Sequence, residues 1–246
     1  MRIVAWNIRA GGGRRAGQIA DQLRRWRPDV VALSEFRATP PSRWLAGALA
    51  EQGLRHQRTT ADPRNAASNS LLVAARWPLR RVGVRASFAP AGRWLLARID
   101  APRPFAIGAM HVPNRVSGLK YPFLDGLLDL ARRWRGGPAL FAGDTNSGWI
   151  GIDEEAPAFN AREDGWMTAM ERAGWPDAFR RLHGHRRAYT WYSPNGRNGF
   201  RLDEAFVNRA LLPRMLGARY RWGRTEAGAP REALSDHAAL IVELGD

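Results

Sequence analysis

The sequence predicts an α/β protein folded as a four-layer α/β/β/α sandwich, in which two mostly antiparallel sheets pack face to face with helices outside. Three observations lead to this fold class. Apolar runs of strand length recur along the whole chain, only two clear helical patterns interrupt them, and no Pro-, Ser- or Gly-rich linker divides the sequence. Many strands with few helices, covered on both sides, are typical of a two-sheet sandwich flanked by helices. We therefore expect one domain over residues 1–246.

The chain opens with a strand, a helix and a second strand. Residues 2–7 form a buried strand, which the three glycines at 11–13 end. A helix follows, because apolar side chains recur there at helical spacing: Ile19, Leu23 and Trp26. Pro28 ends this helix. Residues 29–35 then form another buried strand.

A run of strands joined by turns with Pro or Gly comes next, over residues 69–76, 80–88, 93–100 and 104–112. A long amphipathic helix follows, and five residues mark its apolar face: Leu119, Phe123, Leu127, Leu130 and Trp134. Residues 139–143 are a further strand and residues 164–174 a helix. Three strands close the chain, near residues 201–208, 216–222 and 237–244.

The charge of the chain predicts an acidic partner. Lys and Arg number 38 against 23 Asp and Glu, so the net charge is +15. A positive field of this size attracts polyanions, chiefly nucleic acid. Codon bias is the alternative, because Lys120 is the only lysine. Such bias explains the choice of Arg over Lys, but it does not explain the excess of basic over acidic residues.

Other features exclude several classes of protein. The chain has no cysteine, which excludes disulfides, thiolate metal sites and cysteine nucleophiles. The first residues lack the apolar core of a signal peptide. No uncharged run approaches the ~18 residues that cross a bilayer. We therefore expect a soluble cytoplasmic protein that makes no membrane contact and is a monomer.

Acidic, amide and imidazole side chains recur at the carboxyl ends of the apolar strands, where the backbone leaves the core. These residues are Asn7, Glu35, His111, Asp144 with Asn146, Asp203, and Asp236 with His237. Each alone has an ordinary interpretation, because a carboxylate at a strand end usually forms a turn or caps a helix. Asp203 could instead pair with Arg201, two residues away. Their recurrence along the whole chain favours one shared site.

The residue types at these positions suit phosphodiester hydrolysis. Mg²⁺ prefers hard oxygen ligands, usually one or two carboxylates completed by water and substrate phosphate. The reaction needs a positioned water, a group that deprotonates it, and donors for the charge on the phosphoryl oxygens. Carboxylates, amides and histidines supply these parts without cysteine.

Five short blocks resemble the signature motifs of the endonuclease/exonuclease/phosphatase superfamily, and they occur in the family order. The blocks are Trp6-Asn7, Leu33-Ser34-Glu35, Gly143-Asp144-Thr145-Asn146, Arg201-Leu202-Asp203 and Ser235-Asp236-His237. They span nearly the whole chain. Gly-Asp-x-Asn followed about ninety residues later by Ser-Asp-His is the specific part of the resemblance.

The resemblance implies a metal side and a water-activating carboxylate. Glu35 would be the principal Mg²⁺ ligand, with Asn7 beside it and Asp236 completing the metal region. Mn²⁺ is expected to substitute for Mg²⁺. Asp144 would orient the attacking water and remove its proton.

The resemblance also implies a phosphate side. Asn146 would donate a hydrogen bond to the phosphoryl oxygens, and His237 would contact the scissile phosphate while Asp203 orients its ring. His111 occupies the block where family members carry Tyr or His near the leaving group. It would protonate the departing oxygen or donate a hydrogen bond to the phosphate; a packed core histidine is the alternative.

Within the superfamily, the exonuclease III and apurinic/apyrimidinic endonuclease branch is the most similar. Tyr189-Thr-Trp-Tyr192 followed by Gly199-Phe-Arg-Leu-Asp203 resembles the branch's region that accepts a base-free sugar. The matching apolar residues are Trp191, Phe200 and Leu202, for which plain core packing is the alternative. Lys120 follows the His111 block as a lysine does in the branch, where it lies near the phosphates.

These residues imply a Mg²⁺-dependent DNA repair nuclease that acts on double-stranded DNA, at abasic sites, as a 3′-to-5′ exonuclease, or both. Two alternatives lie within the superfamily: an enzyme for small phosphoesters and a less specific endonuclease similar to deoxyribonuclease I. The chain departs from the branch at two positions: Arg9 replaces the usual second Asn, and His111 replaces the usual Tyr, which favours the deoxyribonuclease I or phosphatase branches. A catalytically silent nucleic-acid-binding module is the third alternative.

Overall fold

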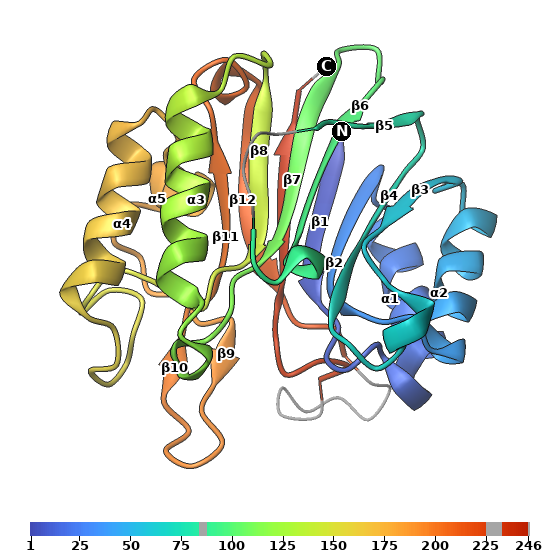
Figure 1. The fold of residues 1–246 in the computed structure, drawn as a ribbon, viewed down its shortest axis with the longest axis horizontal. Coiled ribbons are helices and arrows are strands. Elements are labelled where there is room, and N and C mark those ends of the chain that lie inside the picture. Colours follow the sequence, from blue (N-terminus) through green and yellow to red (C-terminus); the bar gives the residue numbers. More distant parts are fainter. Residues whose placement is uncertain (84–87, 225–232, 246) are drawn as a thin grey trace.

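Two sheets lie back to back at the centre of the structure, with helices on both outer faces (Figure 1). The computed structural model describes residues 1–83, 88–224 and 233–245. In spatial order, the six-stranded sheet contains β12 (Met215–Arg221), β13 (Ala239–Leu244), β1 (Arg2–Asn7), β2 (Val30–Phe36), β4 (Ser70–Ala75) and β3 (His56–Thr59). The five-stranded sheet contains β11 (Asp203–Val207), β8 (Ala139–Asp144), β7 (Phe105–His111), β6 (Trp94–Ile99) and β5 (Leu79–Arg81).

Helices cover the two sheets from opposite sides (Figure 1). The six-stranded sheet carries α1 (Ala16–Trp26) and α2 (Pro40–Glu51), and the five-stranded sheet carries α3 (Lys120–Arg133) and α4 (Ala161–Arg172). Helix α5 (Ala178–His183) contacts β11 and β12, which are edge strands of the two different sheets. A ribbon of β9 (Trp191–Tyr192) and β10 (Gly199–Phe200) stands apart from both sheets. Short 3-10 turns lie at Gly13–Arg15, Pro63–Asn65, Ala91–Arg93, Arg115–Ser117 and Leu212–Arg214.

The layers explain why the central strands are apolar without alternation. Along β1, Ile3 and Ala5 face the core between the two sheets, whereas Val4 and Trp6 face the core beneath α1 and α2. Successive side chains of a strand point to opposite faces. A strand that is covered on both sides therefore has apolar residues throughout. The predicted four-layer sandwich is confirmed.

Two parallel pairings sit at the centres of the sheets and set the position of the site. Strand β1 is parallel to β2, and β7 is parallel to β8, whereas the other pairings within the two described sheets are antiparallel. The expectation of mostly antiparallel sheets is therefore confirmed. Parallel neighbours end at the same edge of a sheet, so the carboxyl ends of these four strands lie at one end of the sandwich (Figure 1).

The strand predicted at residues 80–88 is wrong in its extent. Strand β5 covers only Leu79–Arg81, residues 82, 83 and 88 lie outside any strand, and residues 84–87 fall outside the described part. The remaining predicted strands and helices are present, with ends that differ by a few residues. No helix in the described part of the chain has the length and apolar character needed to cross a membrane.

Candidate active site

Strand pairing brings the predicted residues to one end of the sandwich. Asn7 and Ser34 are paired at the ends of β1 and β2, so Glu35 lies beside Asn7, and His111 and Asp144 are paired at the ends of β7 and β8. Asp203 is paired with Asp144, but it begins its strand, because β11 runs antiparallel to β8. Asp236 and His237 likewise precede β13. The prediction that all these residues end strands is therefore wrong for the last three.

A glycine allows the two central strands to meet at the site. Gly143 has φ +143°, and a Cβ on it would lie 2.0 Å from the carbonyl oxygen of Met110. Only glycine fits this approach without a shift of the backbone. The block Gly143-Asp144 thus holds Asp144 level with His111.

A chain of contacts joins the metal side to the phosphate side. The Asn7 amide Nδ2 donates to Glu35 Oε1 (3.3 Å) and to Asp144 Oδ2 (3.1 Å). The same oxygen of Asp144 lies 3.7 Å from Nε2 of His111 and 3.9 Å from Nε2 of His237. Glu35, Asp144 and His237 therefore converge, although more than 200 residues separate the first from the last.

Asp203 orients the imidazole of His237. Its Oδ2 lies 2.9 Å from Nδ1 of His237, and both side chains are buried. The alternative pairing of Asp203 with Arg201 is not made: Arg201 binds Asp153 and Asp177 instead. Because Nδ1 is engaged by the carboxylate, Nε2 of His237 is the nitrogen that faces Asp144.

Two site residues hold the left-handed backbone conformation that residues with a side chain rarely adopt. Glu35 has φ +55° at a break in register between β2 and β4, and Asn146 has φ +49°. Such conformations cost of order 1–3 kcal/mol each and concentrate at functional sites. The break turns Glu35 toward the site, where its Oε2 accepts a hydrogen bond from the Ala10 amide (2.7 Å).

Asn146 is fixed by the loop that carries it. Its backbone N–H donates to Asp144 Oδ1 (2.9 Å), and its side-chain Nδ2 donates to the carbonyl of Val112 (2.8 Å). The first hydrogen bond closes the turn that a carboxylate at a strand end usually forms. Asp144 thus forms a turn with one oxygen and faces the two histidines with the other.

The three buried groups at the centre have perturbed pKa values of different sign. Burial raises the pKa of Asp144 to about 7, against the opposing charge of His237. Burial alone would lower the pKa of His237, but the carboxylates of Asp203 and Asp144 raise it to about 10. Burial, with help from Arg93 and His237, lowers the pKa of His111 well below its usual value. At neutral pH, His237 is therefore charged and His111 is neutral.

The donor set on the metal side fits a hard divalent cation. Asn7, Glu35 and Asp236 offer only oxygen ligands. The charges of Asp236 and Glu35 both act on Arg15. Within the described residues, no three His, Asp or Glu side chains form a group that could hold a metal ion. Mg²⁺ does not require one, because it is commonly held by one or two carboxylates plus water and substrate phosphate.

The four predicted substrate-binding residues lie at different depths. Trp191 is half-buried, with its ring 6.5 Å from that of His237. Phe200 and Leu202 are buried, but they belong to none of the three core clusters that the described residues form. Lys120 is buried beneath the site, where its ammonium donates to the Asn146 carbonyl and to Glu163.

The sequence did not predict Arg93 as a residue of the site. This residue is half-buried just before β6, where burial lowers the pKa of its guanidinium and the charges of Glu35 and Asp144 oppose that shift. The charge of Arg93 also helps to lower the pKa of His111. Arg93 thus adds a cation to the site. In a chain with so many arginines, nothing in the sequence distinguishes it.

A buried ionic network behind the site was also missed. Arg201 is fully buried and binds both oxygens of Asp153 (2.7 and 2.9 Å) and one of Asp177 (2.9 Å). The Tyr220 hydroxyl accepts from Arg201 (3.1 Å) and donates to the carbonyl of Asp203 (2.7 Å). The network therefore holds the backbone of the residue that orients His237.

The same network reaches the loop that follows Asp144. The buried carboxyl of Glu204 accepts from the Thr145 hydroxyl, and burial raises its pKa well above the usual value. Although burial acts the other way, Arg201 and Arg180 hold the pKa of Asp153 below its ordinary value.

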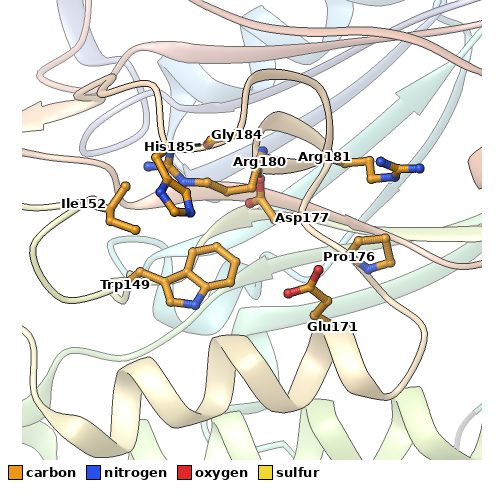
Figure 2. A pocket seen from close by; sticks show the side chains of 9 residues that line it. All are labelled: Trp149, Ile152, Glu171, Pro176, Asp177, Arg180, Arg181, Gly184 and His185. Carbon is orange, nitrogen blue, oxygen red and sulfur yellow. Dashed lines mark hydrogen bonds between the residues drawn. The ribbon is translucent and has the colours of Figure 1, made fainter.

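The network also borders a cavity on the side of α4 and α5 (Figure 2). The cavity has a volume of about 330 Å³, and Trp149, Asp177, Arg180 and His185 are among the residues that line it. Asp177 and Arg180 are shared with the network. None of the predicted site residues lines this cavity.

Comparisons with known proteins agree with the geometry. The family model described as "Endonuclease/Exonuclease/phosphatase family" matches residues 4–237. No curated protein sequence matches the chain. Among solved structures, a 3′-5′ exonuclease from Neisseria meningitidis is similar over 100% of both chains, with a TM-score of 0.81 and 19% identity.

Two further solved structures are similar in fold. An AP endonuclease from Archaeoglobus fulgidus is 18% identical, with a TM-score of 0.81 over 99% of both chains. A 3′ phosphatase from Neisseria bound to a product DNA hairpin is 19% identical, with a TM-score of 0.77 over 100% of both chains. These neighbours match the branch that the sequence resembles. The chain therefore belongs to the endonuclease/exonuclease/phosphatase family and is a hydrolytic enzyme that acts on phosphodiester bonds.

Proposed function

We propose that the protein is a divalent-metal-dependent DNA repair nuclease, which incises DNA at abasic sites, trims 3′ ends, or does both. The observation that carries this proposal is the position of Asp144. Its buried carboxylate lies between Asn7 and Glu35 on one side and the imidazoles of His111 and His237 on the other. A metal side and a phosphate side that share one carboxylate suit in-line attack of water on a phosphodiester.

Glu35, Asn7 and Asp236 would hold the metal. A bound Mg²⁺ would polarise the phosphoryl oxygen and offset its growing charge. This assignment is supported by the break in register of β2 at Glu35 and by the amide of Asn7, which donates to both Glu35 and Asp144. We expect Mn²⁺ to replace Mg²⁺, since both accept oxygen ligands.

Asp144 would remove the proton from the attacking water. A pKa of about 7 suits this task, because a general base works best when its pKa lies near the operating pH. The water oxygen bonds to phosphorus, the P–O ester bond breaks, and the departing oxygen takes a proton from solvent. Asn146 has a second amide hydrogen besides the one that binds Val112, and it would donate to a phosphoryl oxygen.

The two histidines would bind the phosphate in different charge states. His237 carries a positive charge at neutral pH, because its pKa is raised to about 10. His111 is neutral, because burial lowers its pKa well below the usual value. A neutral imidazole is a poor proton source, so hydrogen bonding to the phosphate is favoured over protonation of the departing oxygen. Arg93 supplies a second cation beside it.

Several features support DNA as the substrate. The net charge of +15 favours a polyanion. Solved structures similar in fold are a 3′-5′ exonuclease, an AP endonuclease and a 3′ phosphatase with a product DNA hairpin. Trp191, Phe200 and Leu202 would form the apolar wall beside a base-free sugar. Lys120 would act indirectly, by fixing the Asn146 carbonyl.

A cleavage panel tests the proposal. The protein with Mg²⁺ or Mn²⁺ is offered an abasic duplex, an intact duplex, a 3′-phosphate end, single strands, RNA and a generic phosphodiester. We expect cleavage of the abasic duplex or trimming of 3′ ends, a stop on addition of EDTA, and a steep loss of activity with added salt. Equal cleavage of abasic and intact duplex would remove the abasic-site specificity and leave a general nuclease. Hydrolysis of only the generic phosphodiester would refute DNA as the substrate.

A further inference from the structure

Two aromatic rings stack on each other at the surface beside the candidate site. The ring centroids of Tyr192 and Trp222 are 6.0 Å apart, and their planes differ by 29°. Tyr192 is 49% exposed, and Trp222 is half-buried. The rings come from different parts of the fold: Tyr192 belongs to β9, and Trp222 directly follows β12. An exposed aromatic ring of this kind costs hydrophobic free energy in water unless a partner covers it.

Backbone contacts tie both rings to the segment that carries His237. Tyr192 follows Trp191, which forms a bridge with His237. Trp222 precedes Gly223, whose carbonyl accepts from the N–H of Leu234 (2.9 Å), three residues before His237. The pair therefore adjoins the site along two independent segments.

The pair nevertheless lies apart from the reacting groups. Successive side chains of a strand point to opposite faces. The ring of Trp191 accordingly lies near Phe200 and His237 (6.0 and 6.5 Å), whereas the ring of Tyr192 lies against Trp222. A group stacked on Tyr192 would therefore belong to the part of a substrate next to the reacting phosphate.

Basic residues surround the pair in the sequence and are exposed. Arg197 lies in the turn between β9 and β10, and Arg221 and Arg224 flank Trp222. Arginines beside exposed aromatic rings are the combination that binds single-stranded nucleic acid, since the rings stack on bases and the cations contact phosphates. Every base has an apolar face, so this contact does not depend on sequence.

We propose that Tyr192 and Trp222 form a stacking platform for an unpaired base next to the scissile phosphodiester. This inference rests on the proposed function, because it takes nucleic acid as the substrate. It adds that the preferred substrate has a single-stranded or frayed segment beside the bond that is cut. The platform contributes to binding of that segment and not to the chemical step.

Binding measurements with matched variants test the platform. All proteins carry Asp144→Asn so that DNA stays intact, and the ligands are a fluorescent single-stranded oligonucleotide and a blunt, fully paired duplex. Tyr192→Ala and Trp222→Ala are compared with Tyr192→Phe, which keeps a ring. Trp44→Ala is the control, because Trp44 is 57% exposed on α2, on the outer face of the six-stranded sheet.

We expect Tyr192→Ala and Trp222→Ala to weaken binding of the single strand by about 5- to 150-fold, the range for losing one stacked base. Binding of the blunt duplex should fall less, and Tyr192→Phe and Trp44→Ala should bind almost as the parent does. With Asp144 intact, hydrolysis of a generic phosphodiester by Tyr192→Ala should be unchanged.

Two results would overturn the platform: equal binding by Tyr192→Ala and Trp44→Ala, or an equal loss for the single strand and the blunt duplex. Loss of generic phosphodiester hydrolysis in Tyr192→Ala would also overturn it, because the residue would then support the site as a whole. Failure of the proposed function looks different: the unmutated protein would cleave no DNA, and the Asp144→Asn parent would bind none.

Discussion

The charge on His237 depends on Asp203, and Asp203→Asn tests this dependence. The carboxylate oxygen lies 2.9 Å from Nδ1 of His237, and both side chains are buried. Asparagine has nearly the same shape and keeps an oxygen that can accept the hydrogen bond. The substitution therefore removes the negative charge and leaves the contact almost unchanged.

The expected size of the effect follows from the pKa of His237, about 10 against an ordinary value of 6.5. Asp203 is the strongest cause that raises it. An opposite charge at this distance shifts a pKa by about 1–3 units, so we expect a fall of that size in Asp203→Asn. At 1.36 kcal/mol per unit, the variant loses roughly 1–4 kcal/mol of stability at pH 7.

The sign of the pH dependence follows from the direction of the shift. Because the folded-state pKa of His237 is raised, its contribution to stability is complete below about pH 6.5 and is lost as pH rises through about 10. Asp203→Asn should therefore differ most from the parent at neutral and acid pH. The difference should vanish in strongly alkaline solution.

The measurement is an NMR titration of the His237 ring in metal-free protein, together with the alkaline limb of kcat/KM against pH. In Asp203→Asn, both should move toward neutral pH. Asp236→Asn is the matched control, because Asp236 is the last of the named causes that raise the pKa of His237, and its shift should be smaller. If His237 still titrates near pH 10 in Asp203→Asn, the reasoning is wrong.

Four further outcomes are expected. Asp144→Asn should abolish turnover and leave DNA binding nearly intact, as gel-shift and cleavage assays would reveal; near-normal turnover would contradict its role. Activity should fall as pH drops below about 7, because Asp144 gains a proton there; an acid limb near pH 4 would contradict this. Glu35→Ala should lose activity that excess Mn²⁺ partly restores, and no rescue in a metal titration would argue against ligation. Arg201→Met should destabilise the protein by roughly 3–5 kcal/mol in urea unfolding, since it leaves buried carboxylates unpaired; a change below 1 kcal/mol would contradict the network.

The sequence was most informative where apolar strands end in polar residues. The run before Asn7 and the run before Asp144 each predict a buried strand, and the polar residue marks the point at which that strand leaves the core. The direction of a strand is not visible in this way. Asp203 starts its strand because β11 is antiparallel to β8, and only the register could reveal that.

The elements that were missed lack a clear apolar pattern. Strand β3 (His56–Thr59) lies at the edge of its sheet and is largely exposed, so its residues are polar. Helix α2 begins with Pro40 and Pro41, which are typical of turns but also suit the first turn of a helix. Helix α5 (Ala178–His183) has only 6 residues. None of these three segments carries a predicted site residue, whereas the short ribbon of β9 and β10, which was also missed, carries Trp191 and Phe200.

The ionic network around Arg201 lay beyond prediction for another reason. Asp153, Asp177 and Glu204 come from three segments, and charged residues are usually exposed. Nothing in a single sequence indicates that they meet inside the protein. The same reasoning applies to Arg93, which contributes to the site only because the fold brings its charge near Glu35 and Asp144.

The position of β1 in the middle of its sheet affects how the chain can be made. Its two neighbours are β2, which is synthesised soon after it, and β13, which begins more than 200 residues later in the chain. Until then one edge of β1 has no partner, and an unpaired apolar edge invites association with other chains. A nascent or truncated chain that ends before residue 239 therefore lacks the strand that closes the sheet, and it is expected to depend on chaperones or to aggregate.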